Sequence, residues 1–172
     1  MIWQFPALIQ LDKSQHIWPK DIIKERIIPG MKPRDLTQEE SVALLSTARY
    51  GRLGLSLKDL PYVIPMSYVY SNNKIYLHSR GGGKKIDFVS GNYRVCFQID
   101  RLDKDRWSSV VAYGKARLSS DIEAKRKMFE AFTQKGLGGH GGKQFSREEL
   151  ERMDMTVWEI EIDEMTGREG IW

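Results

Sequence analysis

Three consecutive glycines followed by two lysines are the residues whose types and spacing most directly favour ligand binding. They run from Gly81 to Lys85, after a strand-like IYLHS segment and before a helix-like IDFV segment. Consecutive glycines tolerate positive φ, so their N–H groups can form a concave anion site, and a helix N-terminus adds its dipole. Lys84 and Lys85 add full positive charge. The stretch suits a phosphate or another anionic group, although an ordinary solvated basic loop explains the same residues equally well.

A proline lies inside the strand-like run that precedes this loop, Tyr62 to Tyr70. Because Pro65 has no N–H to donate, the strand is expected at a sheet edge or bulged there. A bulged edge could hydrogen-bond a flat polar heterocycle through its backbone, and an edge protected against aggregation is the alternative. The short SNN turn predicts a hairpin with residues 74–79, which places Pro65 and the glycine-lysine loop in one small sheet.

Isolated histidine and cysteine residues give weaker signals. His78 is expected on the polar side of a strand and Cys96 is a lone strand cysteine, so neither establishes catalysis. The histidines lie far apart and no Cys-x-x-Cys pair is present, so no metal site is predicted. Gly136 to Gly141 match G-x-G-x-x-G, but a helix precedes them where a dinucleotide site needs a strand. A flexible connection between two helices is the preferred interpretation.

The composition is that of a globular chain of ordinary domain size. The 172 residues are 41% hydrophobic and 29% charged, with a formal net charge of +4. This charge permits an anionic ligand, but no basic stripe indicates nucleic acid. No apolar run approaches the roughly 18 residues of a membrane span, and the N-terminus lacks the basic region of a signal peptide. We therefore expect a cytoplasmic protein with no nucleic-acid or membrane partner.

The elements that must position these residues begin at residue 37. Capping-box patterns at Thr37, Ser120 and Ser146 each predict a helix, and a short helix is expected from Lys84 to Val89. Short turns require antiparallel hairpins, so we expect a mainly β, α+β fold: a small antiparallel barrel with peripheral helices. Residues 1–30 are expected to form an N-terminal arm, and residues 31–172 the domain. The predicted strands cover residues 52–57, 62–70, 74–79, 93–100, 107–118 and 155–162.

Four segments in this order resemble a known family: YVIPMSYVY, IYLHSRGGGKKIDFV, NYRVCFQID and WSSVVAYGKARL. They are similar to the FMN-binding split barrels related to pyridoxamine 5'-phosphate oxidase, in the branch that includes the 5-nitroimidazole resistance reductases. The resemblance covers about residues 31–167. It implies a six-stranded antiparallel split β-barrel and a homodimer with FMN at the subunit interface. Aromatic residues that a monomer would expose, such as Tyr68, Tyr70 and Trp107, also favour a dimer.

The resemblance also implies a role for individual residues. Lys84 and Lys85 match the basic pair that binds the FMN phosphate, and His78 matches a histidine near the flavin, which makes it the candidate catalytic residue. Ser109 and Val110 match a strand that completes the site from the other subunit. The remaining implied cofactor contacts are Tyr62, Val63, Ile64, Pro65, Met66 and Ser67 on one strand, and His78 and Ser79 at the end of the next.

The implied function is that of an FMN-dependent oxidoreductase. It would pass electrons from a nicotinamide donor, NADH or NADPH, to a small oxidised acceptor such as a nitroaromatic or a quinone. FMN is expected instead of FAD because the basic pair ends the site at one terminal phosphate. The chain ends MTGREGIW, without the substrate-binding signature of true pyridoxamine-phosphate oxidases, so vitamin B6 oxidation is not expected. The alternative is a flavin- or haem-binding module without turnover, acting as a carrier, sensor or interaction protein.

Overall fold

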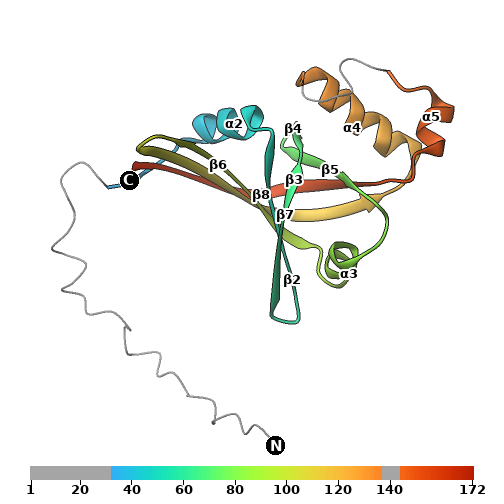
Figure 1. Ribbon diagram of the computed structural model, residues 1–172, viewed down its shortest axis with the longest axis horizontal. Helices are drawn as coiled ribbons and strands as arrows, with labels where there is room; N and C mark the ends of the chain where they lie inside the picture. Colours follow the sequence, from blue (N-terminus) through green and yellow to red (C-terminus); the bar gives the residue numbers. More distant parts are fainter. Residues whose placement is uncertain (1–31, 137–143) are drawn as a thin grey trace, which may run out of the picture. The chain divides into compact units, whose positions relative to one another are not determined.

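An antiparallel sheet of eight strands is the framework of the computed structural model, which describes residues 32–136 and 144–172 (Figure 1). Seven strands follow the hydrogen-bonded order β3-β2-β6-β7-β8-β5-β4, and β1 pairs with β8. Residues 33–172 form one compact unit. The strands are β1 (Arg34–Asp35), β2 (Tyr50–Leu57), β3 (Leu60–Ser67), β4 (Val69–Ser71), β5 (Lys74–Ser79), β6 (Arg94–Asp103), β7 (Arg106–Ser119) and β8 (Thr156–Ile171), and the helices are α2 (Gln38–Thr47), α3 (Lys84–Gly91), α4 (Ile122–Gln134) and α5 (Arg147–Arg152).

The expected split-barrel class is confirmed, but the described residues form eight strands where six were predicted, and the sheet is not closed. β3 and β4 belong to one continuous segment that changes partner at Tyr68, since β3 pairs with β2 and β4 pairs with β5. Tyr68 is fully buried, and its hydroxyl donates a hydrogen bond to the Leu45 carbonyl oxygen. Counting this segment as one strand and omitting the two-residue β1 gives the six strands that were predicted.

Two-residue turns join β2 to β3 and β4 to β5. Lys58, Asp59, Asn72 and Asn73 all have positive φ values, between 48° and 62°, as type I′ hairpin turns require. The expected SNN hairpin is confirmed for β4 and β5, but Pro65 is not part of it, because β3 pairs with β2. In the described part of the chain β3 pairs with β2 alone, so the second edge of β3 is open and Pro65 lies at an edge, as predicted.

β8 is longer than the sequence pattern predicts, since it runs to Ile171 where an end near residue 162 was expected. Its first half pairs with both β5 and β7, and its second half continues along β7 and β1. A register shift between Tyr113 and Gly114 of β7 interrupts the ladder. A Cβ on Gly114 would lie only 2.1 Å from the Glu161 carbonyl oxygen, so this approach requires glycine. The length of β8 is set by pairing with its neighbours more than by intrinsic β-propensity.

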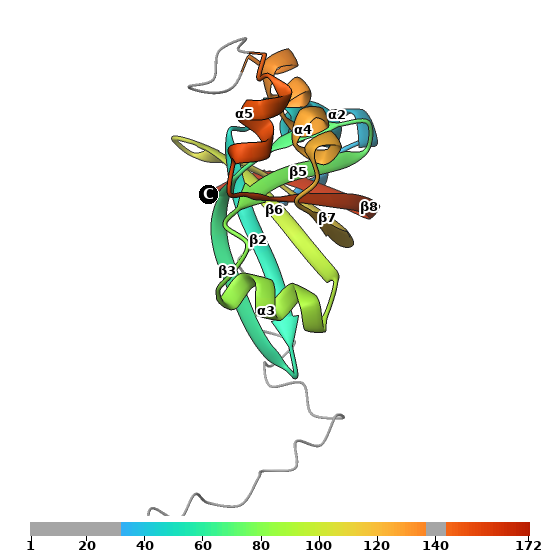
Figure 2. The ribbon, with the colours of Figure 1, turned by 90° about the vertical axis from the view of Figure 1, so that its right-hand side faces the viewer.

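The main core fills the inside of the curled sheet. Alternate residues of the central strands, such as Leu53, Phe97 and Ile160, are fully buried there. α3 packs near β2 on one side of the sheet, and α4 and α5 lie on the opposite side (Figures 1 and 2). A second, smaller core lies under these two helices and consists of Met128, Phe129, Leu150 and Val157.

The predicted helix starts are confirmed for α2 and α5 and need correction for α4. Thr37 and Ser146 each form a complete capping box. The N-cap of α4 is Asp121, one residue after the predicted Ser120, because its carboxylate accepts from the Ala124 N–H at 2.7 Å. Residues 1–30 and most of the Gly136–Gly141 pattern lie outside the described residues. None of the helices in the described ranges is long and apolar enough to cross a membrane.

Candidate functional site

The glycine-lysine loop leads into α3, and the first turn of this helix lies beside β3 (Figure 2). Gly83 is the N-cap, with φ 93° and no side-chain capping hydrogen bond. Its carbonyl accepts from the Ile86 N–H at 2.8 Å, which starts the helix, and Asp87 is the acidic residue of the first turn. No side chain caps the first N–H groups of α3, so the positive end of the helix dipole is available to an anion.

Lys84 rests on two aromatic rings. Its Nζ lies 4.8 Å from the centroid of Tyr62 on β3 and 5.5 Å from the centroid of Phe88 on α3. The two rings contact each other, with centroids 5.2 Å apart and planes inclined at 53°. The structure therefore brings together two of the predicted residues, Tyr62 and Lys84, which are more than twenty positions apart in the sequence.

The predicted β3 residues divide between the two faces of the strand. Tyr62, Ile64 and Met66 are half-buried and pack against the main core. Val63, Pro65 and Ser67 are exposed on the outer face. This alternation follows from the period of two in a strand. Backbone N–H and C=O groups alternate in the same way, so a planar ligand at the open edge of β3 would meet the backbone polar groups of alternate residues, while the others pair with β2.

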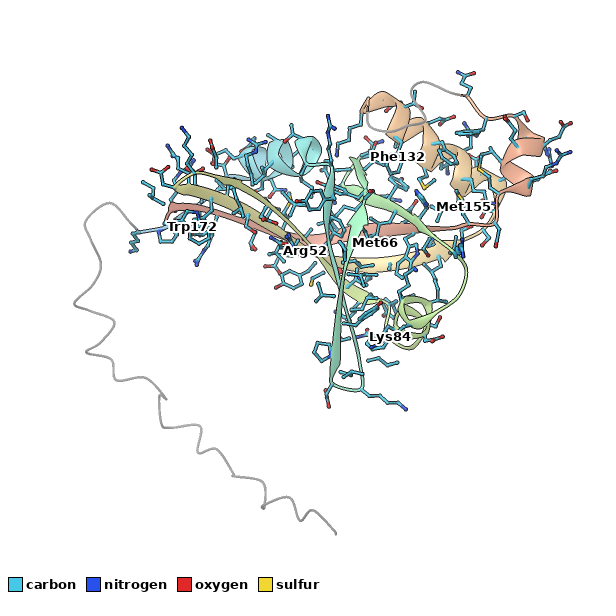
Figure 3. The ribbon with its side chains drawn as sticks, viewed as in Figure 1. Arg52, Met66, Lys84, Phe132, Met155 and Trp172 are labelled. Carbon is cyan, nitrogen blue, oxygen red and sulfur yellow. The ribbon has the colours of Figure 1, made fainter. Side chains whose placement is uncertain are left out.

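The end of β5 also places its two predicted residues on opposite faces. The Ser79 hydroxyl accepts from Trp158 Nε1 at 3.0 Å and donates to the Arg80 carbonyl at 2.9 Å, so it fixes the start of the loop. His78 faces outward, and its ring lies 6.3 Å from that of Phe132 on α4. Phe132 and Lys84 lie on opposite sides of the sheet (Figure 3). A single chain therefore does not gather His78 and Lys84 on one surface, and the catalytic role of His78 remains a prediction.

Ser109 belongs to a polar network on the outer face of the sheet. Its hydroxyl donates to the Ile99 carbonyl and accepts from Gln98 Nε2, both at 3.0 Å. Arg52 on β2 donates to Gln98 Oε1 at 3.0 Å and forms an ion pair with Asp100. The neighbouring Val110 is fully buried in the core, so only its backbone is available to a ligand.

Sequence reasoning missed Phe88 and Arg52, and each had a local signal. Phe88 follows Lys84 by four residues, the spacing that places two side chains on one face of a helix. Arg52 alternates with Leu53 and Leu55, which are buried, so its outward direction follows from the strand period. The partner of each residue could not be predicted, because Phe88 contacts Tyr62 on β3 and Arg52 pairs with Asp100 on β6, and both partners are distant in the sequence.

The lone thiol lies on the outer face of β6, two residues before Gln98, and the described cavity lies elsewhere. Burial raises the pKa of the Cys96 thiol, which agrees with the predicted inert packing. A cavity of about 430 Å³ lies between α4 and the sheet, lined by residues such as Lys74, Tyr76 and Arg117 and by none of the predicted site residues. The surface next to Lys84 is thus formed by β3, the loop and α3.

Comparison with known proteins identifies the class to which this fold and this surface belong. The family model for pyridoxamine 5'-phosphate oxidase matches residues 37–169, and the chain belongs to this family. A solved structure from Bacteroides thetaiotaomicron, described as a candidate 5-nitroimidazole antibiotic resistance protein, is 27% identical and covers 81% of this chain and 89% of its own, with a TM-score of 0.70. The resemblance to this branch, inferred from the sequence, is confirmed.

Two further relatives extend the comparison. A solved FAD-binding protein from Mesorhizobium loti is 28% identical and covers 81% of this chain and 99% of its own, with a TM-score of 0.66. A protein from Rhizobium meliloti, itself uncharacterised, is 28% identical over 142 residues, which make up 78% of this chain and 93% of that protein. Such relatives share nearly the whole described domain, so the similarity is not limited to one motif.

Proposed function

We propose that this chain is an FMN-binding flavoprotein that passes electrons from a nicotinamide donor to a small oxidised acceptor. The observation that supports this proposal best is the placement of Lys84 and the uncapped start of α3 beside the open edge of β3. Two kinds of binding group thereby lie side by side, one for an anion and one for a planar polar ring. Membership of the family and the flavin named for the Mesorhizobium loti relative support the same cofactor class.

The residues present fit FMN at both ends of the molecule. Lys84, Lys85 and the first N–H groups of α3 would hold the phosphate, since ionic donors make the stronger hydrogen bonds. The backbone of β3 from Tyr62 to Ser67 would hold the ring, and Ser79 would fix the loop between the two. We favour FMN over FAD because these positive groups converge on one terminal phosphate. When bound, the flavin supplies hydride and one-electron transfer, and the chain's residues hold and orient it.

The proposal includes a homodimer with the site at the subunit interface. The outer face of the sheet exposes Tyr50 and Val63, each 61% accessible, and Tyr113, 50% accessible. Apolar residues of this kind around the polar Arg52 network support a face that a second copy covers. Ser109 and the Val110 backbone lie on this side of β7 and would complete the partner's site.

One argument for the dimer needs correction. Tyr68 was expected to be exposed in a monomer, but it is fully buried, and Tyr70 and Trp107 are partly buried. Tyr68 is the residue at which the strand changes partner, so its ring enters the core and packs edge-on against Phe97, with ring centroids 4.8 Å apart. The proposal of a dimer therefore rests on the exposed residues of the outer face, Tyr50, Val63 and Tyr113.

Purification of the full chain tests the proposal in three steps. The absorption spectrum should show a flavin, and chromatography of the heat-released cofactor should identify FMN. NADH or NADPH should bleach the bound flavin, and a nitroaromatic or a quinone should restore its colour. Sedimentation should give twice the chain mass. Release of FAD, or a haem spectrum alone, would contradict the cofactor, and a flavin that no donor reduces would favour the carrier or sensor alternative.

A further inference from the structure

We infer that Tyr62 and Phe88 position the Lys84 ammonium group for an anionic ligand, so that Tyr62 helps to set the preference for phosphorylated over unphosphorylated flavin. This inference rests on the proposed function. It adds a positioning role for Tyr62 and a difference between the two lysines, neither of which the sequence reveals. Lys84 and Lys85 are adjacent and chemically identical, but the structure gives them different surroundings.

Phe88 is the fixed point of this arrangement. It is 6% exposed and belongs to the main core, so its ring has little freedom to move. Tyr62 leans on this ring from β3, with centroids 5.2 Å apart, a distance at which aromatic rings attract each other. The two rings thus form a surface that joins α3 to the open-edged strand β3.

Lys84 is exposed, yet its ammonium group has a defined place on this surface. Both ring centroids lie within about 6 Å of Nζ, the range of a cation–π interaction. A flexible lysine loses side-chain freedom when it binds an anion, and a lysine that is already ordered loses less. The rings accept the cation through their faces and use none of its three N–H donors, which stay available to a phosphate.

Lys85 provides the internal comparison. It is half-buried in the same helical turn, and within the described residues its Nζ lies over no aromatic ring. Truncation of either lysine removes one charge from the anion site. Only truncation of Lys84 should make the site insensitive to Tyr62.

A double-mutant cycle measures this coupling. Titrate FMN and riboflavin into the wild-type apo-protein and into Tyr62→Leu, Lys84→Ala and the double variant. Tyr62→Leu should lower the ratio of FMN to riboflavin affinity by about two- to five-fold, the range of a cation–π contact at an exposed site, since it removes the ring face but keeps apolar bulk. In the Lys84→Ala background the same change should leave the ratio nearly constant. Tyr62→Phe keeps the ring face and should restore the ratio.

The matched control truncates Lys85 and leaves Lys84 intact. In a Lys85→Ala background, Tyr62→Leu should still lower the affinity ratio by its full amount. A readout without any flavin checks the contact itself. The ε-methylene protons of Lys84 should shift upfield in the NMR spectrum of the wild-type apo-protein, because they lie over ring faces, and should return toward ordinary values in Tyr62→Leu.

The outcomes separate this inference from the proposed function. A wild type that binds neither FMN nor riboflavin overturns the proposed function, and the inferred ligand with it. A wild type that prefers FMN, combined with an unchanged ratio in Tyr62→Leu, overturns this inference alone. An effect of Tyr62→Leu that persists without Lys84, or a Lys84 resonance that is not shifted by the rings, overturns it as well.

Discussion

Lys84 at the start of α3 and Lys125 within α4 lie on opposite sides of the sheet and in opposite surroundings. Lys125 is 4% exposed, and its Nζ donates to the carbonyl oxygens of Leu150 at 3.0 Å and Met153 at 2.8 Å. These carbonyls belong to the last turn and C-cap of α5, so the buried cation fastens α4 to α5. Within the described residues, the Lys84 ammonium lies over the ring faces of Tyr62 and Phe88 and donates no side-chain hydrogen bond.

The helix starts differ in the same way. In the described chain, α2, α4 and α5 each receive a capping side chain, from Thr37, Asp121 and Ser146. α3 begins at Gly83, which has no side chain to offer. The first N–H groups of α2, α4 and α5 and the ammonium group of Lys125 have hydrogen-bond partners within the protein. The first N–H groups of α3 have no capping side chain and lie at the surface. This difference separates a structural region from the proposed binding region, although both use lysines and helix termini.

Substitution of the buried lysine should have the largest effect on stability. Lys125→Met should lower the free energy of unfolding by about 2–4 kcal/mol, because two carbonyl oxygens lose a charged donor. Chemical denaturation measures this change, and flavin affinity should stay the same. Lys127→Met, on the exposed side of the same helix, is the matched control and should change stability by less than about 0.5 kcal/mol. Equal effects of the two substitutions would remove the proposed contrast.

Substitution of the cap glycine should have an intermediate effect and act on both properties. Gly83→Ala should cost about 1–3 kcal/mol of stability, because φ 93° with ψ 174° is a conformation that residues with a Cβ rarely adopt. It should also weaken FMN binding, since the helix start must rearrange. Gly82→Ala is the control: a Cβ there meets no atom within 4 Å and φ is not in the left-handed region. If both variants bind FMN as wild type does, the backbone at the cap has no part in the site.

The smallest effect concerns a third lysine, Lys135 at the end of α4. Burial lowers its pKa to about 8, although its Nζ donates to the Ala48 carbonyl at 2.9 Å and lies over the Tyr68 ring. Between pH 8 and the ordinary lysine pKa of 10.5, the unfolded chain binds more protons at this group, so its contribution to stability rises with pH. Because Lys135 is only half-buried, the slope should be a fraction of about 1.4 kcal/mol per pH unit.

Comparison of wild type with Lys135→Met isolates that slope. The pKa values of Cys96 and Tyr68 are raised by burial, so these groups bind more protons in the folded state and make stability fall as pH rises. Both variants contain them, and the difference between the two stability curves from pH 8 to pH 10 reports Lys135 alone. A constant difference across this range would contradict the lowered pKa.

The sequence predicted the local features of the fold and missed those set by partners. β5 has the predicted bounds, and the hairpins follow from positive-φ turns that asparagine and short loops favour. The second half of β8 was missed because its pairing with β7 and β1, instead of its own residues, makes it a strand. The helix start at Asp121 was misplaced by one residue because Ser120 and Asp121 are both good caps, and tertiary packing chooses between them.

For the candidate site, too, the sequence predicted the local features but not the contacts between distant residues. Membership of the family could be inferred from four ordered segments, and the anion-binding character of the loop from its glycines and lysines. The contact of Lys84 with Tyr62 could not, because it depends on how α3 packs near β2 and β3. The separation of His78 from Lys84 could not be predicted either, because it depends on which elements pack against each residue: α4 beside His78, and β3 beside Lys84.

Titration of two ligands into two apo-proteins tests the central claim most directly. Wild type and the Lys84→Ala, Lys85→Ala double variant each receive FMN and riboflavin, with folding checked by circular dichroism. Each charge-assisted hydrogen bond is worth about 1.5–3 kcal/mol, so loss of both lysines should weaken FMN binding at least about a hundredfold. Riboflavin, which lacks the phosphate, should bind both proteins almost equally. A folded double variant that binds FMN as tightly as wild type would show that the glycine-lysine loop is an ordinary solvated turn.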